Sequence, residues 1–281
     1  MSERPSDEER RVRRELADGV LLLTLDRPRR KNAFDDAQWI QLRDALDEAR
    51  EDPDVGVVVV TGAGGEFSAG QDLSSFMPAG DPAGEGAGDG ATAREGIQAH
   101  PFQQCMDSLC AFDKPLLAAA TGVAVGIGAT FLYHCDLVYV GQGLRLRMPF
   151  VSLGLVPEAA SSYLLQATIG QQRAAELFFT AEWVGAERAV EVGIAARAYP
   201  DDELLEAVLA KAREMARWPV SSLQATKRCL MAAHRAGIQA AREAENAGMV
   251  QQAGSPENIE AVMAFLQKRE PDFRKLRSEK A

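Results

Sequence analysis

Residue types that mark specialised classes of protein are scarce in this chain of 281 residues. It has only four cysteines and no CxxC pair, which argues against a disulfide framework. The three histidines lie far apart, so we expect no metal site. Lys and Arg number 31 against 41 Asp and Glu, and the formal net charge of -10 argues against general affinity for nucleic acids.

Uninterrupted apolar segments of membrane-spanning length are also missing. The N-terminus is highly charged and has no apolar core, which is not the pattern of a secretory signal. Residues 116–135 are long and apolar enough to suggest a membrane span, but Gly122, Gly126 and Gly128 interrupt them. We interpret this segment as a buried strand that leads into a buried helix, and we expect a cytoplasmic protein with no membrane partner.

Strand and helix patterns alternate along the first half of the chain. Two extended runs, 12–17 and 20–26, flank an Asp-Gly pair and predict a hairpin. They are followed by helical spacing over 35–50, a buried strand within 54–61, a helix over about 95–112 and a strand over 116–120. This alternation predicts an α/β core with right-handed crossovers.

Two other regions depart from that alternation. Residues 78–94 are rich in Gly and Ala and contain no large apolar side chain, so we expect a flexible loop beside a binding site or a disordered insertion. From about residue 160 onward the pattern is entirely helical, with one apolar stripe over 203–217.

Three stretches rich in small residues are candidates for chemistry. The first, 61–72, follows a strand as nucleotide-binding turns do, but a GxGxxG that starts at Gly62 would need glycine where Phe67 stands. The second stretch, 120–129, has two possible interpretations. It forms a helix N-terminus that stabilises a negative charge, or its glycines only allow a helix and a strand to pack closely. In the third, 151–162, Glu158 stands among small and apolar residues. It is either a desolvated base or an exposed acid at the start of a helix.

Five segments together resemble the crotonase superfamily of enoyl-CoA hydratases, enoyl-CoA isomerases and their relatives. The segments occur in the family's order and cover the chain from about residue 12 to 273. They are LDRPRRKNAF (25–34), VVVVTGAGGEFSAGQDL (57–73), KPLLAAATGVAVGIGATFLYHCD (114–136), GLVP (154–157) and FLQKREPDF (265–273).

The resemblance implies a fold, an assembly and a substrate class. The fold is α/β, a spiral of ββα units with a helical C-terminal trimerisation region, assembled as a homotrimer or a dimer of trimers. It divides the chain into a flexible charged tail (1–11), the spiral core with its mobile loop (12–200) and the helical region (201–281). The substrate is an acyl-CoA thioester, so coenzyme A enters as part of the substrate and no separate cofactor is expected.

Site residues are carried over position by position. The backbone N–H groups of Gln71 and Ile127 match the pair that binds the thioester oxygen, a role that needs no particular side chain. The resemblance assigns the CoA to residues near the N-terminus, in the first glycine-rich stretch and near the C-terminus: Arg29, Arg30, Lys31, Ala33, Ala69, Asp72, Phe265 and Lys268. We expect Phe265 and Lys268 to reach the nucleotide of a neighbouring subunit. Candidates for the acyl pocket are Phe76, Met77, His134 and Tyr163.

The sequence departs from the hydratase pattern at both of its acids. Hydratases of the family use two glutamates, and here Thr130 and Phe150 stand in their positions. Glu158 instead resembles the single acid of Δ3,Δ2-enoyl-CoA isomerases. We therefore predict an isomerase of fatty acid metabolism in which Glu158 moves a proton from C2 to C4. Hydration or another crotonase reaction is the alternative, and a non-catalytic acyl-CoA-binding subunit is the alternative of a different class.

Overall fold

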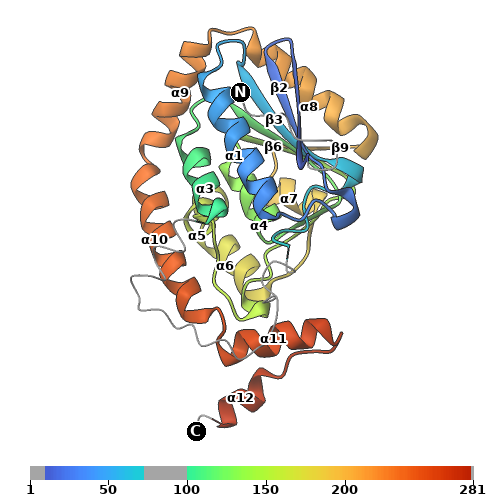
Figure 1. Cartoon of the computed structure of the whole chain (residues 1–281), viewed down its shortest axis with the longest axis vertical. Helices are drawn as coiled ribbons and strands as arrows, with labels where there is room; N and C mark the ends of the chain where they lie inside the picture. Colours follow the sequence, from blue (N-terminus) through green and yellow to red (C-terminus); the bar gives the residue numbers. More distant parts are fainter. Residues whose placement is uncertain (1–9, 73–99, 280–281) are drawn as a thin grey trace.

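The computed structural model describes residues 10–72 and 100–279, and the loop predicted over 78–94 lies outside them. Its main sheet has six strands in the order β1-β2-β3-β4-β6-β9, antiparallel between the first two and parallel elsewhere (Figure 1). The strands are β1 (Val12–Ala17), β2 (Val20–Leu25), β3 (Val57–Gly62), β4 (Leu116–Ala120), β6 (Leu137–Gly141) and β9 (Arg197–Tyr199). A second sheet joins β5 (Val123–Val125), β7 (Arg145–Arg147) and β8 (Val184–Gly185).

The predicted hairpin is confirmed, because β1 and β2 pair antiparallel across Asp18 and Gly19. Both turn residues have positive φ, 52° and 75°, as a two-residue hairpin turn requires. The helix expected over 35–50 is α1 (Asp36–Glu51), and the side chain of Asp35 caps it by accepting a 2.8 Å hydrogen bond from the Gln38 amide.

Alternation along β3 sends its side chains to two different cores. Val58 and Val60 pack on the α1 side with Trp39 and Leu42. Val57 and Val59 face the opposite side, where α8 (Asp201–Ala216) covers the sheet with Leu204, Val208 and Ala212. All four valines are fully buried, as the prediction of a strand buried on both faces requires.

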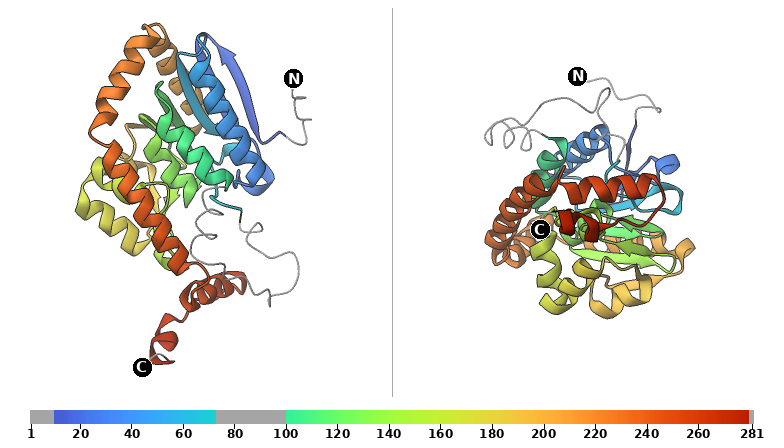
Figure 2. Two further views of the ribbon diagram at one scale, coloured as in Figure 1. Left: turned by 60° about the vertical axis from the view of Figure 1, so that its left-hand side comes forward. Right: turned by 90° about the horizontal axis from the view of Figure 1, so that it is seen from below.

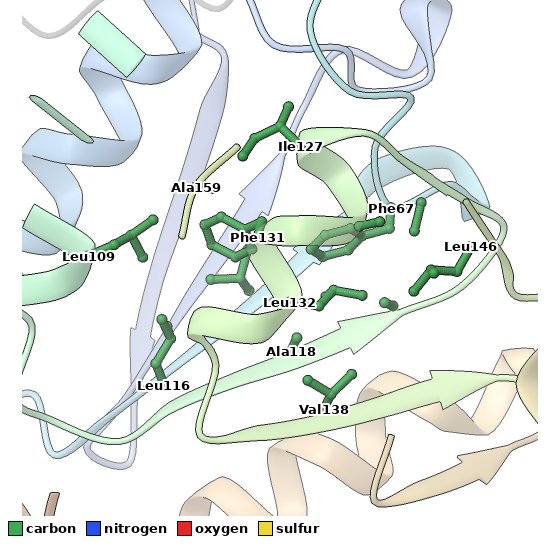
Figure 3. Packing of buried hydrophobic residues seen from close by; sticks show 14 of the residues in the cluster. Phe67, Leu109, Leu116, Ala118, Ile127, Phe131, Leu132, Val138, Leu146 and Ala159 are labelled. Atoms are coloured by element: carbon green, nitrogen blue, oxygen red, sulfur yellow. The ribbon is translucent and has the colours of Figure 1, made fainter. Parts of the chain in front are cut away.

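The segment 114–136 runs from a buried strand into a buried helix, as predicted, but through several short elements. β4 leads through Gly122 to β5, then to α4 (Ile127–Thr130) and to a 3-10 helix, η4 (Phe131–His134). Figure 3 shows Ile127, Phe131 and Leu132 of this segment packed with Phe67 in the buried core. No helix within the described ranges combines the length and the apolar character needed to cross a bilayer.

The prediction that the chain is entirely helical after residue 160 is wrong, because β8 and β9 occur there. They have two and three residues, too few to give a periodic signal, and β9 exists through its pairing with β6. The remaining elements are helical. They are α3 (Pro101–Ala111), α5 (Ser161–Ile169), α6 (Gln171–Thr180), α7 (Ala186–Val192), α9 (Val220–Ala232), α10 (Arg235–Gln252), α11 (Pro256–Leu266) and α12 (Phe273–Glu279).

The C-terminal helices occupy two different places. α8 packs on the sheet, whereas α9 and α10 run along one side of the body and α11 and α12 project beyond it (Figures 1 and 2). α10 contacts α5 and is tied to α3 by hydrogen bonds from Gln103 to Asn246 and from Arg242 to Gln103. Consequently α10, although distant in sequence, lies against the segment that carries Glu158.

Candidate active site

The first glycine-rich stretch forms a compact loop after β3. The buried side chain of Asn32 holds it by donating to the carbonyl oxygens of Ala63 at 2.9 Å and Glu66 at 2.6 Å. The backbone then runs beside β5, since Ser68 bridges to Ala124 and the Val125 amide donates to the Ser68 carbonyl at 3.0 Å. This arrangement brings residues 68–71 against the second glycine-rich stretch.

Glycines allow these two segments to approach each other closely. A Cβ atom at Gly70 would lie 2.5 Å from the Val125 carbonyl oxygen, and one at Gly128 would lie 2.3 Å from that of Ser68. Real side chains do not tolerate such distances. Glycines of the second stretch therefore do allow close packing, as one of its two interpretations expected. The same close packing brings Gly70–Gln71 next to Val125–Gly128.

The amides of Gln71 and Ile127 lie on these two neighbouring segments. Ile127 is the first residue of α4, and a first-turn N–H has no acceptor within its own helix. Among the described residues no backbone carbonyl accepts from it. The side chain of Gln71 anchors this residue, because it accepts a 2.9 Å hydrogen bond from the buried Trp39 indole.

Glu158 lies three residues before α5, so it is not in the first turn of that helix. It is half-buried, and its carbonyl oxygen accepts a 3.0 Å hydrogen bond from the Ser161 amide. The next residue, Ala159, belongs to the same buried cluster as Ile127 and Phe131 (Figure 3). The turn thus runs beside the core segment that follows the Ile127 amide.

The electrostatic surroundings of Glu158 favour its protonated form at neutral pH. Burial, and to a smaller extent the Glu245 carboxylate, raises the pKa of Glu158 to about 8. A carboxylate with a pKa near the working pH is suited to take up and release a proton. Of the two interpretations of this residue left open by the sequence, the desolvated acid is the one that the structure supports.

The two positions that the resemblance aligns with the hydratase acids hold no acid here and are buried. Thr130 is completely buried at the end of α4, and its hydroxyl has no hydrogen-bond partner among the described residues. Phe150 is buried against Phe178, with a ring-centroid distance of 6.4 Å. Neither side chain can hold or activate a water molecule as a carboxylate does.

Most of the predicted CoA-binding residues gather around one short segment. Arg29 and Arg30 are exposed in a 3-10 turn, η1 (Pro28–Arg30), and Lys31 pairs with Glu66 at 2.8 Å. The Ala69 amide donates to the Lys31 carbonyl at 2.8 Å.

The other predicted residues of this group are less accessible. Ala33 is buried close by, and the guanidinium of Arg27 pairs with Asp72 at 3.0 Å. Lys31 also lines a surface hollow of about 540 Å³ together with Glu66 and Arg145.

Phe265 and Lys268 are not brought to that segment within one chain. Phe265 is 62% exposed on α11, which projects away from the body in Figures 1 and 2, and Lys268 follows that helix. Of the four candidates for the acyl pocket, Phe76 and Met77 lie outside the described residues. His134 donates to the carbonyl oxygen of Ala159, and the Tyr163 hydroxyl lies 3.0 Å from Nδ1 of His234.

One acidic residue near Glu158 was missed by the sequence interpretation. Glu245 of α10 is buried, and its carboxylate accepts from the amides of Ala160 and Ser162. A signal was present, because Glu245 lies four residues after Ala241 and seven after Ile238. It therefore falls on the same face of the helix as Ile238, which is buried.

Comparison with known proteins places nearly all of the chain in one family. Residues 15–276 match the enoyl-CoA hydratase/isomerase family. The 2,3-dehydroadipyl-CoA hydratase of Escherichia coli (strain K12) is 35% identical, over 91% of this chain and 95% of that protein. Enoyl-CoA delta isomerase 2 of Rattus norvegicus is 30% identical, over 88% of this chain and 61% of that protein.

The fold agrees with that match. The crystal structure of an enoyl-CoA hydratase/isomerase from Pseudoalteromonas atlantica T6c superposes with a TM-score of 0.84 and 32% identity, covering 94% of this chain and all of that one. The α/β fold is thus the crotonase fold predicted from the five segments. The chain belongs to the enoyl-CoA hydratase/isomerase family, which acts on acyl-CoA thioesters.

Proposed function

We propose that this protein is an isomerase that converts a 3-enoyl-CoA into a 2-enoyl-CoA, with Glu158 as its single base. The observation that carries the proposal is the combination of one half-buried carboxylate of raised pKa with a threonine and a phenylalanine at the two hydratase acid positions. Moving a double bond requires one group that removes and returns a proton, whereas hydration also requires a positioned water.

The reaction balances with the groups at hand. Ionised Glu158 removes a proton from C2, and the electron pair is delocalised through the C3=C4 double bond and the thioester carbonyl as a dienolate. The N–H groups of Gln71 and Ile127 would donate to the enolate oxygen, and each such donor is worth about 3–4 kcal/mol of barrier. Protonated Glu158 then delivers the proton to C4, which leaves the double bond between C2 and C3.

Recognition of the CoA would fall to Arg29, Arg30 and Lys31. Their exposure and their nearness to the first glycine-rich loop support this assignment, because a chain of net charge -10 needs local cations to hold a polyanion. A homotrimer or a dimer of trimers would let Phe265 and Lys268 complete that site from a neighbour. The exposed apolar residues of α11, among them Ile259 and Leu266, support such an assembly.

Hydration of a 2-enoyl-CoA is the second candidate, because the Escherichia coli relative is named as a hydratase. A non-catalytic acyl-CoA-binding subunit is the third outcome of the same assays. We expect conversion of a 3-enoyl-CoA by the purified protein, with little hydration of crotonyl-CoA. Tight binding of CoA esters without turnover of either substrate would favour the binding subunit.

The decisive variant is Glu158→Gln, which preserves shape and removes the base. Loss of a general base lowers kcat about 10²- to 10⁴-fold, and we expect a loss in this range with KM changed little. Glu182→Gln is the matched control, since Glu182 is exposed on the loop before β8. Isomerisation by Glu158→Gln at near the original rate would eliminate the single-base mechanism.

A further inference from the structure

The turn that carries Glu158 has an unfavourable backbone conformation. Ala159 and Ala160 have φ values of 60° and 57°. They are two consecutive left-handed residues, and neither is a glycine. Each costs about 1–2 kcal/mol relative to a right-handed conformation. Surrounding groups must therefore hold this turn, because the local sequence does not favour it.

Glu245 holds the turn from α10. Its two carboxylate oxygens accept from the amides of Ala160 at 2.7 Å and Ser162 at 2.8 Å, and the residue is only 5% exposed. These amides lie at the start of α5, where a Ser, Thr, Asp or Asn side chain usually caps the helix. Ala160 occupies the cap position and has no such group, so a carboxylate from 85 residues further along the chain takes its place.

His134 holds the carbonyl end of the peptide unit whose N–H donates to Glu245. Its Nε2 lies 2.7 Å from the Ala159 carbonyl oxygen. Burial lowers the pKa of His134 to about 4, so the ring is neutral at pH 7, and the proton that it keeps is the one donated from Nε2. The peptide unit that joins Ala159 to Ala160 is thus held at both ends, at its carbonyl oxygen by His134 of η4 and at its N–H by Glu245 of α10.

The cations near Glu245 form their ion pairs with other acids, although the charge of Arg242 still favours ionised Glu245. Arg242, one turn earlier on α10, pairs with Asp107 of α3 at 2.7 Å, and Lys227 of α9 pairs with Asp136 at 2.8 Å. Glu245 itself forms no ion pair within the described part of the chain. Burial raises the pKa of Glu245 overall, and the hydrogen bonds from Ser162 and Ala160, together with the charge of Arg242, limit that rise.

We propose that Glu245 is a positioning residue for catalysis: its carboxylate fixes the strained turn that aims Glu158, and its negative charge keeps Glu158 strongly basic. The inference rests on the proposed role of Glu158 and adds a group that does not touch the substrate. It implies that α10 belongs functionally to the active site.

Two substitutions separate the two effects of Glu245. Glu245→Gln removes the charge and keeps one acceptor oxygen. In the pH profile of kcat/KM, we expect the midpoint of the rise to move to lower pH by about one unit. A shift of that size is typical of the loss of a nearby like charge. Glu245→Asp keeps the charge and shortens the reach. We expect its plateau kcat to fall about 10- to 100-fold through displacement of the base, with the pH of the rise closer to that of the unmodified protein.

Glu243→Gln is the matched control, because Glu243 lies on the same helix and is exposed. Its pH profile and kcat should equal those of the unmodified protein. A purely structural role for Glu245 would lower the melting temperature of the variants but leave the pH of the rise unchanged. If Glu245→Gln does not fold, Glu245→Asp still decides, since a plateau kcat within twofold of the original overturns the positioning role.

Failure of this inference is distinguishable from failure of the proposed function. If Glu158→Gln is inactive while Glu245→Gln and Glu245→Asp keep the original kcat and pH profile, only the role of Glu245 is refuted. If Glu158→Gln remains active, the proposed base is wrong and the inference falls with it. Both comparisons use the full chain and the same 3-enoyl-CoA substrate.

Discussion

The two halves of the candidate site are built in opposite ways. In the amide half, residues 68–71 and 124–128 meet because Gly70 and Gly128 have no side chains to keep the backbones apart. In the carboxylate half, the turn at Glu158 depends on side chains from remote segments, Glu245 and His134. The amide half should therefore be sensitive to added volume, and the carboxylate half to changes in charge.

The largest effect is expected from added volume in the amide half. Gly128→Ala places a methyl group 2.3 Å from the Ser68 carbonyl oxygen, so the two segments must separate and the Ile127 amide must move. Loss of one oxyanion donor lowers kcat about 10²- to 10³-fold, and we expect a loss of this size in steady-state kinetics. Gly185→Ala is the control, because its methyl group meets no atom within 4 Å and φ there is -85°. A Gly128→Ala enzyme with kcat within threefold of the original would contradict the proposed role of this half.

A pH titration tests the carboxylate half directly. Glu158 must be ionised to remove a proton, and its pKa of about 8 means that only about one-tenth of the free enzyme is active at pH 7. We expect kcat/KM to rise about tenfold between pH 7 and pH 9 and then to level off. A profile already flat above pH 6 would show that Glu158 is an ordinary exposed carboxylate or is not the base.

The smallest effect concerns Thr130, the buried last residue of the helix that begins with Ile127. Its buried hydroxyl has no partner among the described residues, so Thr130→Val removes an unsatisfied polar group while conserving shape. We expect the free energy of unfolding to increase by about 1 kcal/mol in denaturant titration, with kcat unchanged. Thr168→Val should give no such gain, because the Thr168 hydroxyl donates to the Leu164 carbonyl at 2.8 Å. A large drop in kcat for Thr130→Val would instead assign that hydroxyl a part in the reaction.

Local patterns in the sequence were sufficient for much of the core. The unbroken valine run Val57–Val60, the Asp-Gly turn and the spacing of apolar residues in α1 each report a preference that acts over a few residues. β8 and β9 were missed because two or three residues carry no period and form strands only by pairing with partners. Glu245 was missed because a helix pattern shows that a charge lies on a buried face without showing what it meets there.

The sequence by itself determined the family, the glycines at the two meeting segments, and the absence of acids at positions 130 and 150. These are properties of residue identity and order, and they need no coordinates. Only the tertiary structure decided that Glu158 is desolvated, that its turn is left-handed at two alanines, and that a carboxylate from α10 caps the helix behind it. The basicity of an acid depends on the solvent and charges around it, and the charge beside Glu158 comes from a residue 87 positions later in the chain.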